Sequence, residues 1–188
     1  MRVKFLLWGR RGMRRILLLP VAVIALAGVV SYLAVASERA EGAAAPIFGI
    51  KIFPGYRDWK LISVAHEAGN LNDIRAILGN DVAIKAYREG KPLFPDGSVV
   101  ARLSWNYVPS EENNKVFGRD QSFVAGSRPV WYLQFMVKDS KKYATTGGWG
   151  YAQFDQDGNP ADEAKHGTCF PCHVPVKDRD YIFTRYAP

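Results

Sequence analysis

The sequence predicts an α+β domain that is built mainly from antiparallel β-sheet and carries a few short helices. From residue 98 onward, several runs alternate apolar and polar residues, which is the period of strands that bury one face. Before residue 98, polar caps and glycines bracket two short helical segments. Helices and strands do not alternate along the chain as they would in a parallel sheet, so the pattern favours α+β.

Two short helices are expected first. Asn70 and Gly79 bound one of them, over residues 70–79, because asparagine caps the start of a helix and glycine suits the position after its end. Asp81 caps the other, over residues 82–89. Both segments precede all of the predicted strands.

The sequence Pro95-Asp96-Gly97 predicts a turn, and the strands follow it. The first strand covers residues 98–108, with an apolar face and with Arg102, Ser104 and Asn106 on the other face. Further strands are expected over residues 130–137, 150–154 and 181–186, and a helical turn over residues 162–165.

The chain begins with a segment typical of export. Residues 1–15 hold six basic residues and no acidic one, and residues 16–36 form an apolar run of 21 residues. This layout is that of a secretory signal, with Ala34-Val35-Ala36 as the candidate cleavage site. The run is also long enough to span a bilayer, for which about 20 residues suffice. Residues 1–36 are therefore a signal peptide or an N-terminal membrane anchor, and in both cases the rest of the chain is exported.

Most of the net positive charge of the chain lies in residues 1–36, the leader. The whole chain has a formal net charge of +7, but from residue 37 onward 19 lysines and arginines oppose 18 acidic residues. Nucleic-acid binding needs a basic excess that neutralises phosphates, so no nucleic-acid partner is expected. Residues 37–48 are interpreted as a linker, and residues 49–188 as one domain, large enough to bury a core of its own.

Both cysteines of the chain and one of its three histidines lie within five positions near the C-terminus: Cys169, Cys172 and His173. The spacing C-x-x-C-H is typical of c-type haem attachment. In such a site the two thiols bond to the vinyl groups of one haem, and the adjacent imidazole ligates the iron. This attachment takes place after export, which agrees with the leader.

Three alternatives to haem c remain. A thioredoxin-like redox pair should open a helix inside a βαβ unit, but only fifteen residues follow His173. A structural disulfide suits an oxidising compartment, but it leaves His173 unexplained. Zinc bound by His166, Cys169, Cys172 and His173 is disfavoured because adjacent Cys172 and His173 do not easily point at one tetrahedral ion.

An electron-transfer cytochrome usually closes the second axial position of its iron with methionine or histidine. Neither residue follows His173 in this chain. We expect Met136 to pack in the core, His66 to lie at the surface or cap a helix, and His166 to stay on the proximal side, while ligation by a lysine remains open. The sequence therefore predicts a five-coordinate iron with an open distal face, which suits small-molecule binding or catalysis.

The chain resembles the cytochrome P-460 family, which includes the cytochrome c′-beta proteins, from about residue 56 to residue 188. The resemblance rests on Tyr56-Arg57-Asp58-Trp59, Phe94-Pro95-Asp96-Gly97-Ser98-Val99, Trp105, the TCFPCH motif and Asp180-Tyr181-Ile182-Phe183-Thr184-Arg185-Tyr186. It implies a small periplasmic homodimer, mostly antiparallel β, with one haem c attached near the C-terminus. Cys169 and Cys172 then attach the haem, and His173 is the proximal iron ligand. If the leader is retained, residues 16–36 anchor the domain to the inner membrane.

The resemblance also implies two kinds of chemistry. Catalytic members oxidise hydroxylamine, alone or with nitric oxide, and carry a lysine bonded to the haem edge and a distal carboxylate. The c′-beta members lack this cross-link, have an apolar distal pocket, and bind nitric oxide or carbon monoxide. Where the lysine is expected this chain has Arg102, and an always protonated guanidinium is unsuited to that bond. The nearest lysine, Lys91, precedes the turn.

No distal carboxylate is identified, because Glu111 and Glu112 lie in an apparent loop. Candidates for an apolar distal wall are Trp105, Trp131 and Phe135, for each of which ordinary core packing is favoured. The sequence therefore predicts an exported cytochrome that binds or transforms hydroxylamine or nitric oxide, with a redox partner protein as a further expected contact. A haem oxidoreductase, a non-catalytic gas-binding protein and an electron carrier all remain open, and no catalytic residue is assigned.

Overall fold

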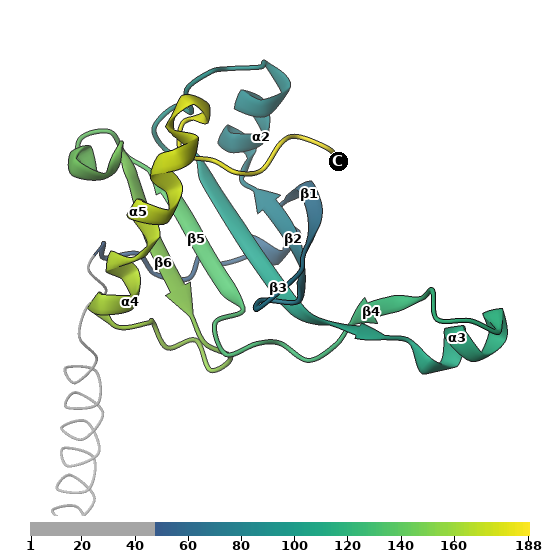
Figure 1. The fold of residues 1–188 in the computed structure, drawn as a ribbon. Coiled ribbons are helices and arrows are strands. Elements are labelled where there is room, and N and C mark those ends of the chain that lie inside the picture. The colour runs from purple at the N-terminus through teal and green to yellow at the C-terminus, as the bar shows by residue number, and fades with distance from the viewer. Residues whose placement is uncertain (1–47) are drawn as a thin grey trace, which may run out of the picture. The chain divides into compact units, whose positions relative to one another are not determined.

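The computed structural model describes residues 48–188 (Figure 1). The predicted leader over residues 1–36, its apolar run over residues 16–36, and the linker as far as residue 47 lie outside the described residues. Within residues 48–188, no helix combines the length and the apolar character that a bilayer crossing needs. Export and anchoring therefore stay predictions.

One antiparallel sheet forms the centre of the described part. Its strands lie in the order β1-β2-β3-β5-β6, and β4 pairs with the far end of β3. The strands are β1 (Lys60–Glu67), β2 (Asp73–Gly79), β3 (Val99–Pro109), β4 (Phe123–Ala125), β5 (Leu133–Lys138) and β6 (Trp149–Phe154). The helices are α2 (Asp81–Arg88), α3 (Glu111–Phe117), α4 (Glu163–Gly167) and α5 (Cys169–His173), and the 3-10 segments are η1 (Tyr56–Asp58), η2 (Ala144–Thr146) and η3 (Val174–Arg179). The predicted α+β class, mainly antiparallel with short helices, is confirmed.

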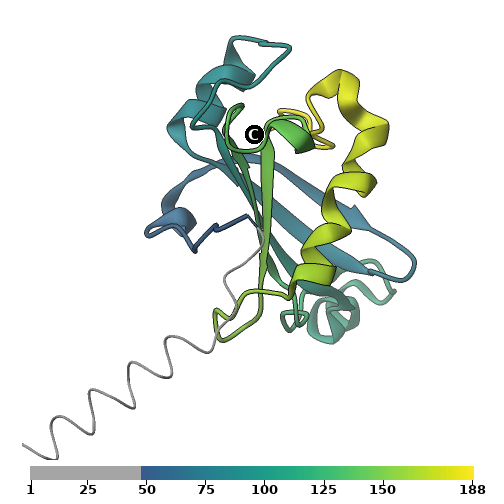
Figure 2. The same ribbon diagram turned by 90° about the vertical axis from the view of Figure 1, so that its left-hand side faces the viewer.

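The two faces of the sheet carry different layers. The strand register pairs Ile77 with Arg102, Arg102 with Gln134, and Gln134 with Gln153, so these side chains share one face. Figure 2 shows α4 and α5, in yellow, over one side of the sheet and the segment before β1, in blue, over the other. We call the side that carries α4 and α5 the helix face. Because apolar residues of α2 share a core with those of β6, α2 packs on the helix face as well.

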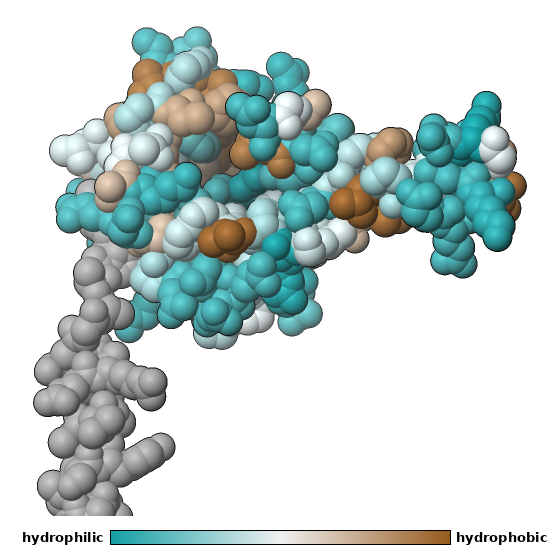
Figure 3. Space-filling view, turned by 60° about the horizontal axis from the view of Figure 1, so that its bottom comes forward, coloured by the Kyte–Doolittle hydropathy of each residue, from teal (hydrophilic) through white to brown (hydrophobic). Residues whose placement is uncertain are grey.

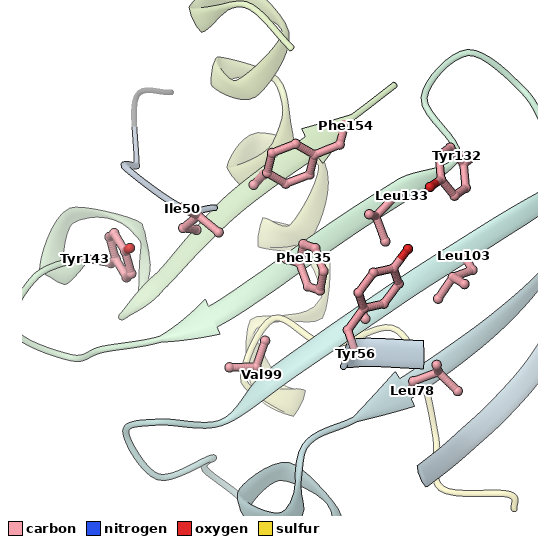
Figure 4. Packing of buried hydrophobic residues seen from close by; sticks show 12 residues of the cluster. Ile50, Tyr56, Leu78, Val99, Leu103, Tyr132, Leu133, Phe135, Tyr143 and Phe154 are labelled. Atoms are coloured by element: carbon pink, nitrogen blue, oxygen red, sulfur yellow. The ribbon is translucent and has the colours of Figure 1, made fainter. Parts of the chain in front are cut away.

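The opposite face buries the larger aromatic core. Phe135 is almost fully buried there, and its ring centre lies 5.2 Å from that of Phe53 and 5.4 Å from that of Tyr56. Figure 4 shows the buried side chains gathered around it. The segment before β1 thus covers this face of the sheet with its own aromatic residues, and burial of such side chains is the main favourable term in folding.

The predicted helix over residues 70–79 is wrong, because most of this segment is β2. The capping residues Asn70 and Gly79 favoured a helix there, but β2 pairs with β1 on one side and β3 on the other, and this pairing overrides the local signals. β1 is a strand that the sequence pattern did not predict. The second predicted helix is confirmed as α2, with Asn80 rather than Asp81 as its N-cap, since the Asn80 side chain accepts a hydrogen bond from the Ala83 N–H.

The strands predicted over residues 98–108, 130–137 and 150–154 correspond to β3, β5 and β6. The predicted helical turn over residues 162–165 is the start of α4, capped by Asp162. The final strand predicted over residues 181–186 is wrong. This tail runs across α2 instead, where the Tyr87 hydroxyl donates to the Thr184 carbonyl at 3.1 Å.

β3 continues beyond the sheet into an arm. Its pairing with β5 ends at Leu103, and its last residues pair with β4. Figure 1 shows the arm projecting from the sheet with α3 near its tip. Glu111 and Glu112 form the first turn of α3, so the predicted loop at these residues is wrong. Two large apolar side chains near the tip are exposed, Val116 at 80% and Phe117 at 54%.

Candidate functional site

The cysteine motif forms α5, which lies against the edge strand β6. Just before it, the Asp162 carboxylate accepts a hydrogen bond from the Lys165 N–H at 2.7 Å and so begins α4. His166 on α4 is fully buried, and its Nε2 accepts a hydrogen bond from the Gln153 N–H at 2.9 Å. This contact fastens α4 to β6 and thereby positions α5.

Cys169 and Cys172 lie three positions apart on α5, and their thiols are not joined to each other. Cys169 is half-buried beside β6, where the Gln153 side-chain amide lies 3.7 Å from its Sγ. Burial raises the pKa of the Cys169 thiol. Cys172 is exposed. Both thiols are therefore free for covalent attachment, and the disulfide alternative has no support in this arrangement.

His173 has the geometry of a metal ligand. Its Nδ1 lies 2.6 Å from the Tyr181 carbonyl oxygen, so Nδ1–H donates to that oxygen and Nε2 keeps its lone pair. Burial lowers the pKa of His173, which favours the neutral imidazole. The rings of Tyr151 and Phe183 flank it, with centres 5.1 and 5.0 Å away. Metal-bound histidines usually hold the second nitrogen in this way.

The other candidate ligands lie elsewhere. His66 pairs with Ile74 in the strand register, is exposed, and stacks on Tyr107 at 3.9 Å between ring centres on the face opposite α5. The expected surface position of His66 is confirmed. Met136 packs against the helix-face core, as expected. Within residues 48–188, no three histidine, cysteine, aspartate or glutamate side chains gather as a metal site, which leaves the zinc alternative without a ligand cluster.

Core packing, the favoured interpretation for the candidates of an apolar distal wall, is confirmed for two of them, and both lie on the face opposite α5. Phe135 belongs to the core of the opposite face, and Trp105 packs against that core. The reason is the period of two in a strand, which sends Phe135 away from α5 and its neighbours Gln134 and Met136 towards it. Trp131 lies in the turn that precedes β5.

The helix face carries a row of polar side chains instead of an apolar wall. Arg102, Gln134 and Gln153 are aligned across β3, β5 and β6, and the row ends beside Cys169. At its other end, Arg102 donates to Asp73 Oδ2 at 2.5 Å. The position where a lysine was expected therefore holds an arginine that is paired with a carboxylate.

Asp73 is the carboxylate that sequence reasoning missed. It is 3% exposed and accepts further hydrogen bonds from Arg75, whose Nε lies 2.9 Å from Oδ1. Arg75 also pairs with Glu67, so two acidic residues lie on the helix face. Burial lowers the pKa of Arg102. The sequence did carry a signal for this carboxylate: Asp73, Arg75 and Ile77 alternate along the chain as side chains on one face of a strand do. The interpretation of this segment as a helix concealed that signal.

The surface of the described part is hollowed on one side. Figure 3 shows a hollow, walled in part by apolar residues, between the side of the molecule that carries α4 and α5 and the side that carries β1 and β2. Two unjoined thiols and a neutral imidazole with a free Nε2 fit a macrocycle tethered through α5. Together the fold and the site define a small α+β domain with the donor set of a haem protein.

The chain matches the Cytochrome P460 family over residues 53–184 and belongs to it. This match confirms the family that the sequence motifs indicated, and membership implies a haem cofactor. No curated protein matches the chain.

Proposed function

We propose that this protein is an exported cytochrome that carries one haem c, bound through Cys169 and Cys172, and that binds nitric oxide or a related small nitrogen compound at an open iron position. His173 would ligate the iron through Nε2. The observation that carries the proposal is the hydrogen bond from His173 Nδ1 to the Tyr181 carbonyl oxygen, next to two free thiols. The haem supplies a metal centre that binds small ligands and exchanges single electrons.

The positions of the other candidate ligands support an open distal side. His66 stacks on Tyr107 on the opposite face of the sheet, and Nε2 of His166 is engaged by the Gln153 N–H. Met136 is part of β5, packed with the helix-face core. His66 and His166, as placed, are therefore not available to an iron held by α5, whereas Met136 lies on the same face of the sheet as α5 and is packed in the core there.

The occupant of position 102 favours ligand binding over hydroxylamine oxidation. Arg102 is tied to a buried carboxylate by a short ion pair, so its guanidinium is not poised to form a bond to a haem edge. Oxidation of hydroxylamine is the second candidate function. It is favoured by Asp73 and Glu67, which place two carboxylates on the helix face.

One experiment separates these functions. The full chain is produced with a haem-attachment system, and the absorption spectra of its ferric and ferrous forms are recorded before and after addition of nitric oxide. High-spin spectra that convert on nitric oxide binding support the proposal, and a low-spin six-coordinate spectrum supports an electron carrier instead. Turnover of hydroxylamine with an electron acceptor would favour the second candidate. Colourless protein without iron would overturn the proposal.

We further propose a periplasmic location, a homodimer and a redox partner protein. The leader supports export. Exposed apolar side chains on the arm that carries β4 and α3, including Val116 and Phe117, support self-association, because isolated monomers rarely expose such groups together. Sedimentation of the exported protein tests the dimer, and Val116→Asp should convert it to a monomer if the arm forms the contact.

A further inference from the structure

A buried ion pair lies behind the histidine of the site. Lys138, at the end of β5, and Asp180, in the turn after η3, are 8% and 2% exposed. Lys138 Nζ donates to Asp180 Oδ1 at 2.7 Å. Burying two charges is costly unless further hydrogen bonds satisfy them, so such a pair calls for a reason.

The pair joins segments that are far apart in the sequence. The second Asp180 oxygen accepts a hydrogen bond from the Phe94 N–H at 2.8 Å. Lys138 Nζ also donates to the Gly147 carbonyl at 3.1 Å and lies 5.0 Å from the centre of the Trp149 ring. The turn before β3 and the end of β5 therefore both hold Asp180, the residue that precedes Tyr181, and the loop before β6 holds Lys138 in place.

The backbone at this point is unusual. Asp180 and Tyr181 both have positive φ angles, 52° and 63°, which residues other than glycine adopt at an energetic cost and keep only where the surroundings hold them. Gly147 is packed so closely on the Tyr181 ring that a Cβ atom would overlap it. This bend brings the Tyr181 carbonyl within 2.6 Å of His173 Nδ1.

We propose that Lys138 and Asp180 are positioning residues for the axial ligand. They hold the 180–181 bend so that the Tyr181 carbonyl accepts the Nδ1 proton of His173 and Nε2 stays free to bind iron. A fixed acceptor at Nδ1 makes the imidazole a stronger donor, which strengthens the iron–nitrogen bond and stabilises ferric over ferrous iron. The part of this inference that concerns iron rests on the proposed function.

The test compares Asp180→Asn with Asp96→Asn. The Asp96 carboxylate accepts hydrogen bonds from Ser140 N and Oγ at 2.7 and 2.8 Å and touches neither Tyr181 nor His173, so it is the matched control. Because Asp180→Asn leaves an unpaired buried ammonium, the double variant Lys138→Met with Asp180→Asn is made as well. The double variant leaves no unpaired charge in the interior, and it tests the positioning role if the single variant does not fold.

Two readouts report on the imidazole itself. In the haem-loaded ferrous protein, resonance Raman gives the iron–imidazole stretching frequency, and a redox titration gives the midpoint potential. We expect the Asp180 variants to lower the frequency and raise the potential, while Asp96→Asn leaves both unchanged. Folded Asp180 variants with an unchanged frequency and potential would overturn the inference.

A third measurement needs no haem. In the unloaded full chain, nitrogen NMR of the imidazoles shows which ring nitrogen of His173 carries the proton. We expect Nδ1–H in the native protein and in Asp96→Asn, and a loss of this preference in the Asp180 variants. If no haem attaches, the proposed function fails, yet this measurement still supports or overturns the positioning role. A native preference for Nε2–H would refute it.

Discussion

Asp73→Asn tests whether the charged cluster on the helix face is buried as tightly as the structure indicates. This substitution keeps the shape of the side chain and removes its charge, so it leaves no cavity. Asp73 is 3% exposed and pairs with Arg75 and Arg102 at 2.5 Å each. Arg75 keeps Glu67 as a partner, but Arg102 has no other acidic partner among the described residues. Its guanidinium, only 17% exposed, thus loses the one carboxylate with which it forms an ion pair in the described part.

The expected cost follows from this loss. Removing one partner of a buried ion pair destabilises a protein by about 3–5 kcal/mol, mostly because the remaining charge stays buried and uncompensated. For a domain of this size the loss corresponds to a fall in melting temperature of roughly 10 °C. Chemical denaturation of the unloaded full chain, followed by tryptophan fluorescence, measures the change in free energy of unfolding.

Asp81→Asn is the matched control. Asp81 also forms a close pair, with Lys60 at 2.7 Å, but its side chain is 88% exposed. Exposed pairs contribute little because water and salt screen them. We therefore expect no measurable change in the unfolding midpoint. If Asp73→Asn costs no more than Asp81→Asn, the cluster is solvated and the argument from burial is wrong.

Three further predictions concern the site. Cys172→Ala should leave one covalent link between the protein and the haem, at Cys169. The haem should then stay bound in a denaturing gel, and the pyridine haemochrome spectrum should shift. Haem that extracts completely into acidified solvent would contradict attachment at Cys169. Arg102→Lys places a lysine where the family resemblance expects one, and the mass of the haem peptide after exposure to hydroxylamine and oxidant shows whether a third bond forms. Burial lowers the pKa of His166 below its usual 6.5, so the unfolded chain binds the proton more readily. The free energy of unfolding is therefore highest above pH 6.5 and falls as the pH drops from there towards the lower folded-state pKa. His166→Gln should reduce the slope of this fall, and an unchanged slope would contradict the prediction.

The class of fold was predictable because its largest signals are local. The alternation after residue 98 is a period of two that belongs to β3, and Pro95-Asp96-Gly97 forms the predicted turn, with Ser98 N–H donating to the Pro95 carbonyl at 3.1 Å. The C-x-x-C-H motif can also be recognised from the sequence alone, since it occupies five adjacent positions, and its role in haem attachment stays a prediction. These features need no knowledge of the rest of the chain.

β2 and the acidic residues of the helix face were not predictable in this way. The segment around Asp73 has helix-like ends, and only its pairing with β1 and β3 makes it a strand. Once it is a strand, Asp73 meets Arg102, 29 residues later in the chain. A contact of that kind depends on the register between strands, which no local pattern contains.

His173, the proposed axial ligand, shows how a local motif and long-range contacts combine. The motif names His173, but its nitrogen is aimed by Tyr181, whose carbonyl is held by a bend at Asp180. That bend is fixed by Lys138 and by the N–H of Phe94, so the sequence motifs around residues 94 and 180 meet at one carboxylate. The family resemblance identified the segments around residues 94 and 180 but gave no reason why they should meet. The structure supplies a reason, because both segments hold the bend that places the Tyr181 carbonyl against His173 Nδ1, and in the proposed site this contact keeps Nε2 free.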